Sequence, residues 1–271
     1  MILFKMEWKK QYKSFLIWTL LFMFLSLGFS AIYPQMFTPA LKDSMDIMLK
    51  SLPDSMLKTF NIALTGPASM FEPVGFFAYY FQYLYLAACI YASLLGTQAL
   101  INEESEGTID FLYAQPLSRS AILFSKFIAN FTILSTFWLL SALASLGSLL
   151  LFRMSGDPIQ EIINGVTKIY LYEWLVLFFF LTLGFFISSI LKHARHATSL
   201  SLALVFGFYL LGIVGDLLEK LNFLSQWSPV QIGMPSSILN NGLDAAPIVF
   251  LFSLVFLTAS FYCYRKRDFQ S

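Results

Sequence analysis

Long apolar stretches alternate with short polar ones along the whole 271-residue chain. Most of these stretches reach about 20 residues, the length that an α-helix needs to cross the hydrocarbon of a membrane. Backbone groups in hydrocarbon must be hydrogen-bonded within the segment, so the stretches predict helices. We place six spans at residues 14–33, 74–101, 121–152, 169–191, 197–215 and 246–264. The second and third are the longest, and we expect them to tilt or to extend beyond the bilayer.

Residues 1–13 have an amphipathic pattern. Aromatic residues form one helical stripe and lysines form the next: Phe4, Trp8 and Tyr12, then Lys5, Lys9 and Lys13. A basic helix with an aromatic face is typical of the membrane interface, so we predict an N-terminal interfacial helix here. The front of a signal peptide is the alternative, but the following apolar run is too long and no small-residue cleavage site is present.

The first long loop, residues 34–73, also carries helical periodicity. Apolar residues recur with helical spacing over 41–52 and again over 56–64, with Pro53 between them. This pattern predicts two short amphipathic helices, lying on the membrane surface or covering the ends of the spans.

Composition agrees with a membrane protein. The chain is 58% hydrophobic and only 12% charged, with a mean hydropathy of +0.70, whereas a soluble domain has about 25% charged residues. We therefore expect an all-α, polytopic membrane protein in which residues 1–271 form a single transmembrane domain. The net charge of +1 does not indicate a nucleic-acid partner.

The distribution of Lys and Arg predicts the orientation of the spans. Most of the 17 Lys and Arg residues flank the spans on the side of the N-terminus. Basic residues are enriched on the cytoplasmic side of membrane proteins, so both termini and residues 102–120 are expected in the cytoplasm.

A charged segment lies between the second and third spans. Residues 103–116 contain Glu103, Glu104, Glu106 and Asp110, and charge is costly in hydrocarbon, so this segment must lie in water or against another protein. Thr108 is suited to cap a short helix, whose Ile109, Leu112 and Tyr113 share one face before Pro116 ends it. From these residues alone, a solvated loop is as good an interpretation as a docking helix.

The order of residues favours the docking helix. Glu106-Gly107-Thr108, then Pro116-Leu117-Ser118-Arg119, then Lys126 resembles the segment after the second span of ABC-2 type transporter permeases. The Ser228-Pro229 pair before the last span and the Arg267-Asp268 ending also resemble that family, more loosely.

The resemblance implies a type V exporter-like fold in which residues 103–116 form a cytoplasmic coupling helix that binds a separate ATPase subunit. The partner-binding residues would be Glu103, Glu106, Gly107, Thr108, Asp110, Leu112, Tyr113, Pro116 and Arg119. It also implies two permease subunits, identical or related, and two ATPase subunits. ATP and magnesium would be held by the ATPase, with no cofactor or metal in this chain.

Two stripes of small residues predict close helix contacts. Ser199, Ala203 and Gly207 recur every four residues in the fifth span, and because permeases of this family pair, we assign them to the interface with a second permease. Ser141, Ser145 and Ser148 form a similar face in the third span, which we assign to packing within the chain.

Catalytic chemistry is hard to find in the sequence. There is no Gly-x-x-x-x-Gly-Lys-Ser/Thr phosphate loop, so we do not expect the chain to be an enzyme. Glu173 is the nearest candidate for an intramembrane acid, and we interpret it as an interfacial residue that reaches outward. His193 and His196 make a poor metal site, since no Cys or acid is near them. Cys89 and Cys263 lie in apolar runs and are expected to be packing residues.

We therefore expect the permease subunit of an ATP-binding cassette exporter in the bacterial plasma membrane. The 30 Phe and 10 Met residues suit an apolar or amphipathic substrate, such as a peptide, an antibiotic or a lipid-like molecule. The alternative is a self-contained secondary transporter or channel, which needs no ATPase. An intramembrane enzyme is a weaker third hypothesis.

Overall fold

The computed structural model describes residues 2–53, 56–57, 60–102, 118–242 and 245–266. Within these ranges, six helices are long and apolar enough to cross a membrane. They are α1 (Ile2–Met36), α4 (Pro73–Gln98), α7 (Arg119–Leu151), α8 (Ile159–Ile190), α9 (Ala197–Leu217) and α13 (Ala246–Lys266). The described residues contain no strand beyond one isolated bridge. The predicted all-α, polytopic architecture is confirmed.

The remaining helices are short. They are α2 (Pro39–Lys50), α10 (Asn222–Trp227), α11 (Pro229–Ile232) and α12 (Pro235–Asn241), with 3-10 turns at Ala194–His196 and Glu219–Leu221. Helix α2 covers the first amphipathic stretch expected in the first loop. The second stretch is not a helix throughout, because Asn61 has a positive φ of 53° and Ala63 pairs with Ser69 in the isolated bridge.

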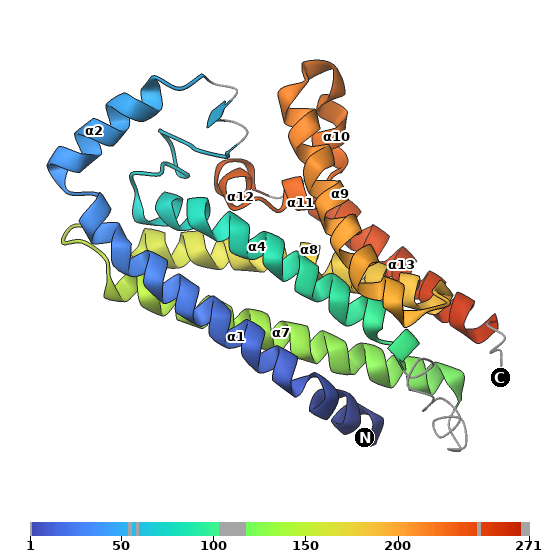
Figure 1. Ribbon diagram of the computed structural model, residues 1–271. Coiled ribbons are helices and arrows are strands. Elements are labelled where there is room, and N and C mark those ends of the chain that lie inside the picture. The colour runs from blue at the N-terminus through green and yellow to red at the C-terminus, as the bar shows by residue number, and fades with distance from the viewer. Residues whose placement is uncertain (1, 54–55, 58–59, 103–117, 243–244, 267–271) are drawn as a thin grey trace.

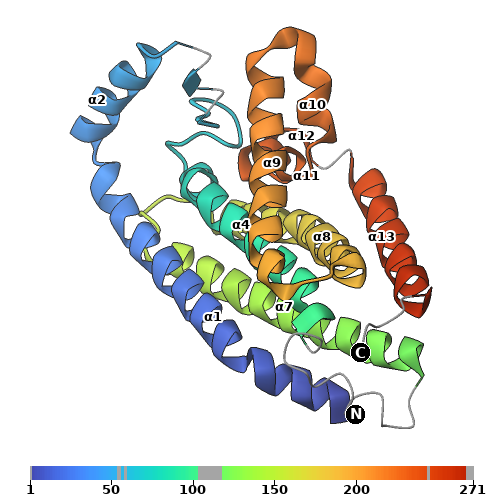
Figure 2. The ribbon, with the colours of Figure 1, turned by 45° about the vertical axis from the view of Figure 1, so that its right-hand side comes forward.

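The long helices form a bundle with α4 and α8 at its centre (Figures 1 and 2). Helices α1 and α7 lie side by side along one flank, while α13 packs on α8 and α9 leans against α4. The first turns of α1 and α7 and the last turns of α4 and α13 lie at the same end of the bundle, whereas α2 and α10 lie at the other (Figure 1).

Two predicted boundaries differ from the observed helices. Residues 2–13, expected as a separate interfacial helix, are continuous with the first span in α1. The predicted fourth span, 169–191, is only part of α8, which begins at Ile159. The added turns are amphipathic: Ile162 and Val166 are buried while Glu161 is exposed, so the helix extends beyond the purely apolar stretch.

Glycines bring α4 and α8 together. A Cβ atom on Gly96 would lie 2.3 Å from the Leu181 carbonyl oxygen, and one on Gly184 would lie 2.6 Å from the Ser93 carbonyl oxygen. Any side chain at either position would force the two backbones apart. Neither glycine belongs to the small-residue stripes that the sequence suggested.

The serine face of the third span packs inside the chain, as predicted. Ser145 Oγ lies 2.8 Å from Ser26 Oγ of α1 and 2.8 Å from Tyr170 Oη of α8. Ser148 Oγ lies 3.0 Å from Ser30 Oγ. These buried hydroxyls satisfy one another and hold α7 between α1 and α8.

Candidate functional site

The structure describes the residues on either side of the predicted ATPase-binding segment, residues 103–116. Of the predicted partner-binding residues, Arg119 is described, and it lies exposed at the start of α7. The others lie outside the described residues: Glu103, Glu106, Gly107, Thr108, Asp110, Leu112, Tyr113 and Pro116. The geometry of the candidate site is therefore that of the two helix ends on either side of it.

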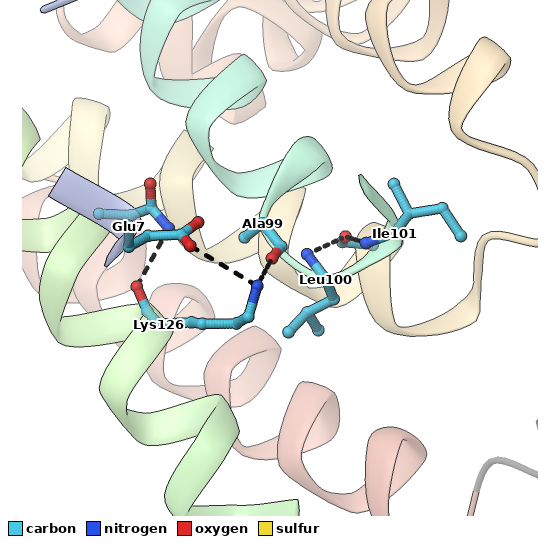
Figure 3. A network of polar contacts seen from close by, with 7 residues as sticks. Glu7, Ala99, Leu100, Ile101 and Lys126 are labelled. Carbon is cyan, nitrogen blue, oxygen red and sulfur yellow. Dashed lines mark hydrogen bonds and ion pairs between the residues drawn. The ribbon is translucent and has the colours of Figure 1, made fainter. Parts of the chain in front are cut away.

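The upstream flank is fixed to α8. Helix α4 ends at Gln98, where the Ala99 N–H donates to the Gly96 carbonyl oxygen. The backbone N–H groups of Leu100 and Ile101 donate to Ser188 Oγ at 3.0 Å and 3.2 Å (Figure 3). Both residues are buried, so these bonds satisfy amides that water does not reach.

The downstream flank is fixed to the upstream one by Lys126 of α7. Lys126 Nζ donates to the Ala99 carbonyl oxygen at 2.7 Å and lies 3.7 Å from Glu7 Oε2 of α1 (Figure 3). The Lys126 and Glu7 side chains are 2% and 7% exposed, so the ion pair is buried. A buried pair of this kind is costly to break, because the remaining charge loses its partner.

The start of α7 has further anchors. Ser118 caps the helix by accepting a hydrogen bond from the Ala121 N–H. Arg119 Nη1 donates to the Arg265 carbonyl oxygen at 3.4 Å, which connects α7 to the end of α13. Asn130 Nδ2 donates to the Lys126 carbonyl oxygen one turn along α7.

We call Glu7, Ala99, Lys126, Asn130 and Ser188 the Lys126 cluster. It connects α1, α4, α7 and α8 at the point where the chain leaves α4 and enters α7 (Figure 3). Among the described residues, no group of three His, Cys, Asp or Glu side chains that could hold a metal ion lies at this end. Hydrogen bonds and an ion pair therefore connect the two flanks of residues 103–116 to each other and to α1 and α8.

A family-wide sequence model described as "ABC-2 family transporter protein" matches residues 1–269. The chain belongs to the ABC-2 family. ABC-2 proteins are the membrane components of ABC transporters, so this chain is a multi-pass permease that associates with an ABC ATPase, and catalysis is not the role of this component. No curated protein matches the sequence.

The opposite end of the permease contains a segment that folds back into the bundle. Gly233, between α11 and α12, packs against Tyr85 halfway along α4, where a Cβ atom would lie 2.0 Å from Tyr85 Oη. Tyr85 Oη donates weakly to the carbonyl oxygens of Pro229 and Val230, each at 3.4 Å. Ser228 caps α11, which accords with the expected Ser-Pro pair before a short helix.

The predicted subunit-interface stripe of the permease lies on the outer surface of α9. Ser199 and Ala203 are exposed and Gly207 is half-buried. A Cβ atom on Gly207 would have no neighbour within 4 Å among the described atoms. Helix α9 contacts α4 through another face, where Ser201 Oγ lies 2.7 Å from Thr97 Oγ1. The stripe is thus available to another molecule.

Glu173 is placed differently from its sequence interpretation. The prediction that Glu173 is an interfacial acid reaching outward is wrong, because Glu173 lies near the middle of α8 and is fully buried. Neither carboxyl oxygen has a hydrogen-bond partner among the described residues. The sequence marks Glu173 as the only acid inside its apolar run, but its burial depends on how the helices pack.

The two histidines of the permease lie in the exposed turn between α8 and α9. Arg195 Nε donates to His196 Nε2 at 3.2 Å. Across the described part of the chain, no three His, Cys, Asp or Glu side chains come together as a metal site would require. Cys89 is buried and Cys263 is half-buried, and both are free thiols.

Proposed function

We propose that this permease is the membrane half of an exporter in the bacterial plasma membrane, that residues 103–116 are its coupling helix, and that the cargo is apolar or amphipathic. ATP and magnesium are held by the ATPase, and the permease contributes the path through the membrane. Two permeases and two ATPase subunits form the working complex.

The observation that carries this proposal is the Lys126 cluster. The buried Lys126 of α7 joins the two flanks of residues 103–116 through its hydrogen bond of 2.7 Å to the Ala99 carbonyl oxygen. A displacement of the segment by an ATPase is therefore passed to α4 and α7 together, and through Glu7 and Ser188 to α1 and α8. A solvated loop needs no such anchoring.

The orientation supports the same reading. The start of α1, both flanks of the predicted coupling helix and the end of α13 share one end of the bundle (Figure 1). The Lys and Arg distribution favours the cytoplasm for that end. A cytoplasmic ATPase then has access to residues 103–116.

A secondary transporter or channel is the competing function. The buried Glu173 is a feature that ion-coupled carriers also use. However, the interiors of the spans carry no second acid or histidine from which a relay could be built. The permease sequence therefore favours an external energy source.

The experiment is to purify the permease from its native membrane and to measure ATPase activity in the purified material. We expect a stable complex whose ATP hydrolysis drives uptake into inside-out vesicles. Transport by the isolated chain without an ATPase would overturn the proposal in favour of the secondary transporter.

A further inference from the structure

We propose that Glu173 is a substrate-binding residue that pairs with the positive charge of an amphipathic organic cation. The inference rests on the proposed function, because it names the chemical class of the cargo. It starts from a buried acid for which the described part of the chain supplies no counter-charge.

The position of Glu173 is central. It lies near the middle of α8, is 0% exposed, and has both carboxyl oxygens without a hydrogen-bond partner among the described residues. An ionisable group inside a membrane bundle is costly, and it is kept there mainly where it serves a ligand, an ion or a proton. Without such a role, an apolar side chain at this position would stabilise the bundle more than a carboxyl group does.

Two tyrosines and a cysteine lie near Glu173. Tyr85 and Cys89 of α4, and Tyr170 of α8, are the ionisable groups near enough to interact with it electrostatically. The Tyr170 ring lies 4.9 Å from that of Phe81 and 4.6 Å from that of Trp138, measured between centroids. Aromatic faces attract cations, and a carboxylate among such rings is a recurring way to bind organic ammonium groups.

The turn between α11 and α12 covers one side of the proposed site. The turn at Gly233 packs against Tyr85 and against Val176, which lies about one turn along α8 from Glu173. In this conformation the carboxyl is sealed within the protein. Withdrawal of α11 and α12 would open the space beside Tyr85, so loading and release require the movement that an ATP-driven cycle supplies.

A cation explains these features better than a proton relay. A relay usually needs a chain of Asp, Glu or His side chains, and on α8 the nearest charged residue is Lys168, which donates to the Leu239 carbonyl oxygen instead. A single acid near the rings of Tyr85 and Tyr170 is suited to hold one cationic group of a larger, mainly apolar molecule.

The test uses two probes of the same shape and opposite charge, tetraphenylphosphonium and tetraphenylborate. Each is titrated into the purified permease–ATPase complex in nanodiscs, and both probe binding and stimulation of ATP hydrolysis are measured. We expect the cation to bind and stimulate and the anion to do neither. Glu173→Gln should weaken cation binding about tenfold or more, since a buried charge pair is lost.

Matched variants separate binding from structure. Glu173→Asp should keep a preference for the cation, whereas Glu161→Gln, an exposed acid on the same helix, should behave like the wild type. Tyr85→Phe keeps the ring and should retain the preference, and Tyr85→Leu should weaken it. Thermal unfolding of each complex checks the fold, and the cation-over-anion preference of the wild type stands as a test even if Glu173→Gln does not fold.

Equal response of the wild type to both probes would overturn the inference. So would unchanged cation binding in folded Glu173→Gln, or an effect of that variant on the pH profile of basal ATP hydrolysis alone, which would assign Glu173 to proton binding. These outcomes leave the proposed function standing, because they are measured on an active complex; failure to obtain any ATPase-active complex would instead contradict the proposed function.

Discussion

Helices α4 and α8 differ from α9 and α13 in what surrounds them. In the most apolar stretch of both α4 and α8, 72% of the residues are buried, against 22% in α9 and 17% in α13. The central pair meets at Gly96 and Gly184, with backbone in direct contact. The outer pair presents large apolar side chains such as Phe206, Leu210 and Leu251 to the surroundings.

This difference separates a central pair of helices, α4 and α8, which we call the frame, from an outer pair, α9 and α13, that faces the surroundings. Helices enclosed by protein can use glycine contacts and buried hydroxyls, because most buried polar groups find a partner inside, with Glu173 an exception. Helices that face lipid or a second subunit keep apolar side chains outside, where no partner is fixed. We therefore expect α4 and α8 to move as one unit, and α9 and α13 to be the surface on which assembly occurs.

The largest effect should come from separating the central pair. Gly184→Leu places a side chain where a Cβ atom alone would lie 2.6 Å from backbone. Overpacking of this kind costs about 3 kcal/mol or more, so we expect little folded protein. The measurement is the monodisperse yield in detergent followed by thermal unfolding. If Gly184→Leu gave the same monodisperse yield as Gly207→Leu, the α4–α8 contact would not be essential to the fold.

The Lys126 cluster should give the next effect. Lys126→Met leaves Glu7 buried without its partner and the Ala99 carbonyl oxygen without its donor. Breaking a buried pair from one side costs about 3–5 kcal/mol, whereas replacing both partners with apolar residues is often tolerated. The double variant Glu7→Leu with Lys126→Met should thus regain stability. A double variant that is destabilised by the sum of the single effects would indicate that the two charges do not interact.

Substitutions on the outer face of α9 should affect assembly and spare the fold. Ser199→Leu, Ala203→Leu and Gly207→Leu add bulk to a face that is open in the single chain. We expect weaker pairing of permeases, with monomer stability changed by no more than about 0.5 kcal/mol. Size-exclusion chromatography with light scattering measures the pairing. Normal pairing in all three variants would mean that this face contacts lipid.

The smallest perturbation tests orientation only. A cysteine replacing Ser105, in a background without Cys89 and Cys263, should react with an impermeant thiol reagent in inverted vesicles and not in intact cells. The Lys and Arg distribution motivates this expectation. Labelling from outside intact cells would reverse the assigned orientation.

The sequence predicted the spans well because the length of an apolar run is a local property. The added turns of α8 were missed, since Ile159–Lys168 alternate apolar and polar positions and resemble a loop by composition. The helical residues 2–13 were recognised, although their continuity with the first span depends on packing: the Trp8 indole N–H donates to Thr132 Oγ1 of α7.

Contacts between residues far apart in the chain could not be predicted from the sequence. The first two spans and their loops lie between Glu7 and Lys126, and the sequence around either residue does not indicate that they pair. Gly96 and Gly184 look like any glycine in an apolar run until the helices are placed together. Glu173 was noticed and then misplaced, because its burial depends on how the helices pack.

The central claim is that residues 103–116 transmit the work of an ATPase to the frame. The direct measurement is substrate-stimulated ATP hydrolysis by the complex, with co-purification of the ATPase, in Leu112→Ala combined with Tyr113→Ala. Apolar anchors in a groove contribute about 2 kcal/mol or more each, whereas rim charges contribute less. We therefore expect the double variant to lose coupling and partner binding while still inserting in the membrane, and Asp110→Asn to be affected less. Full coupling and normal co-purification in the double variant would contradict the account.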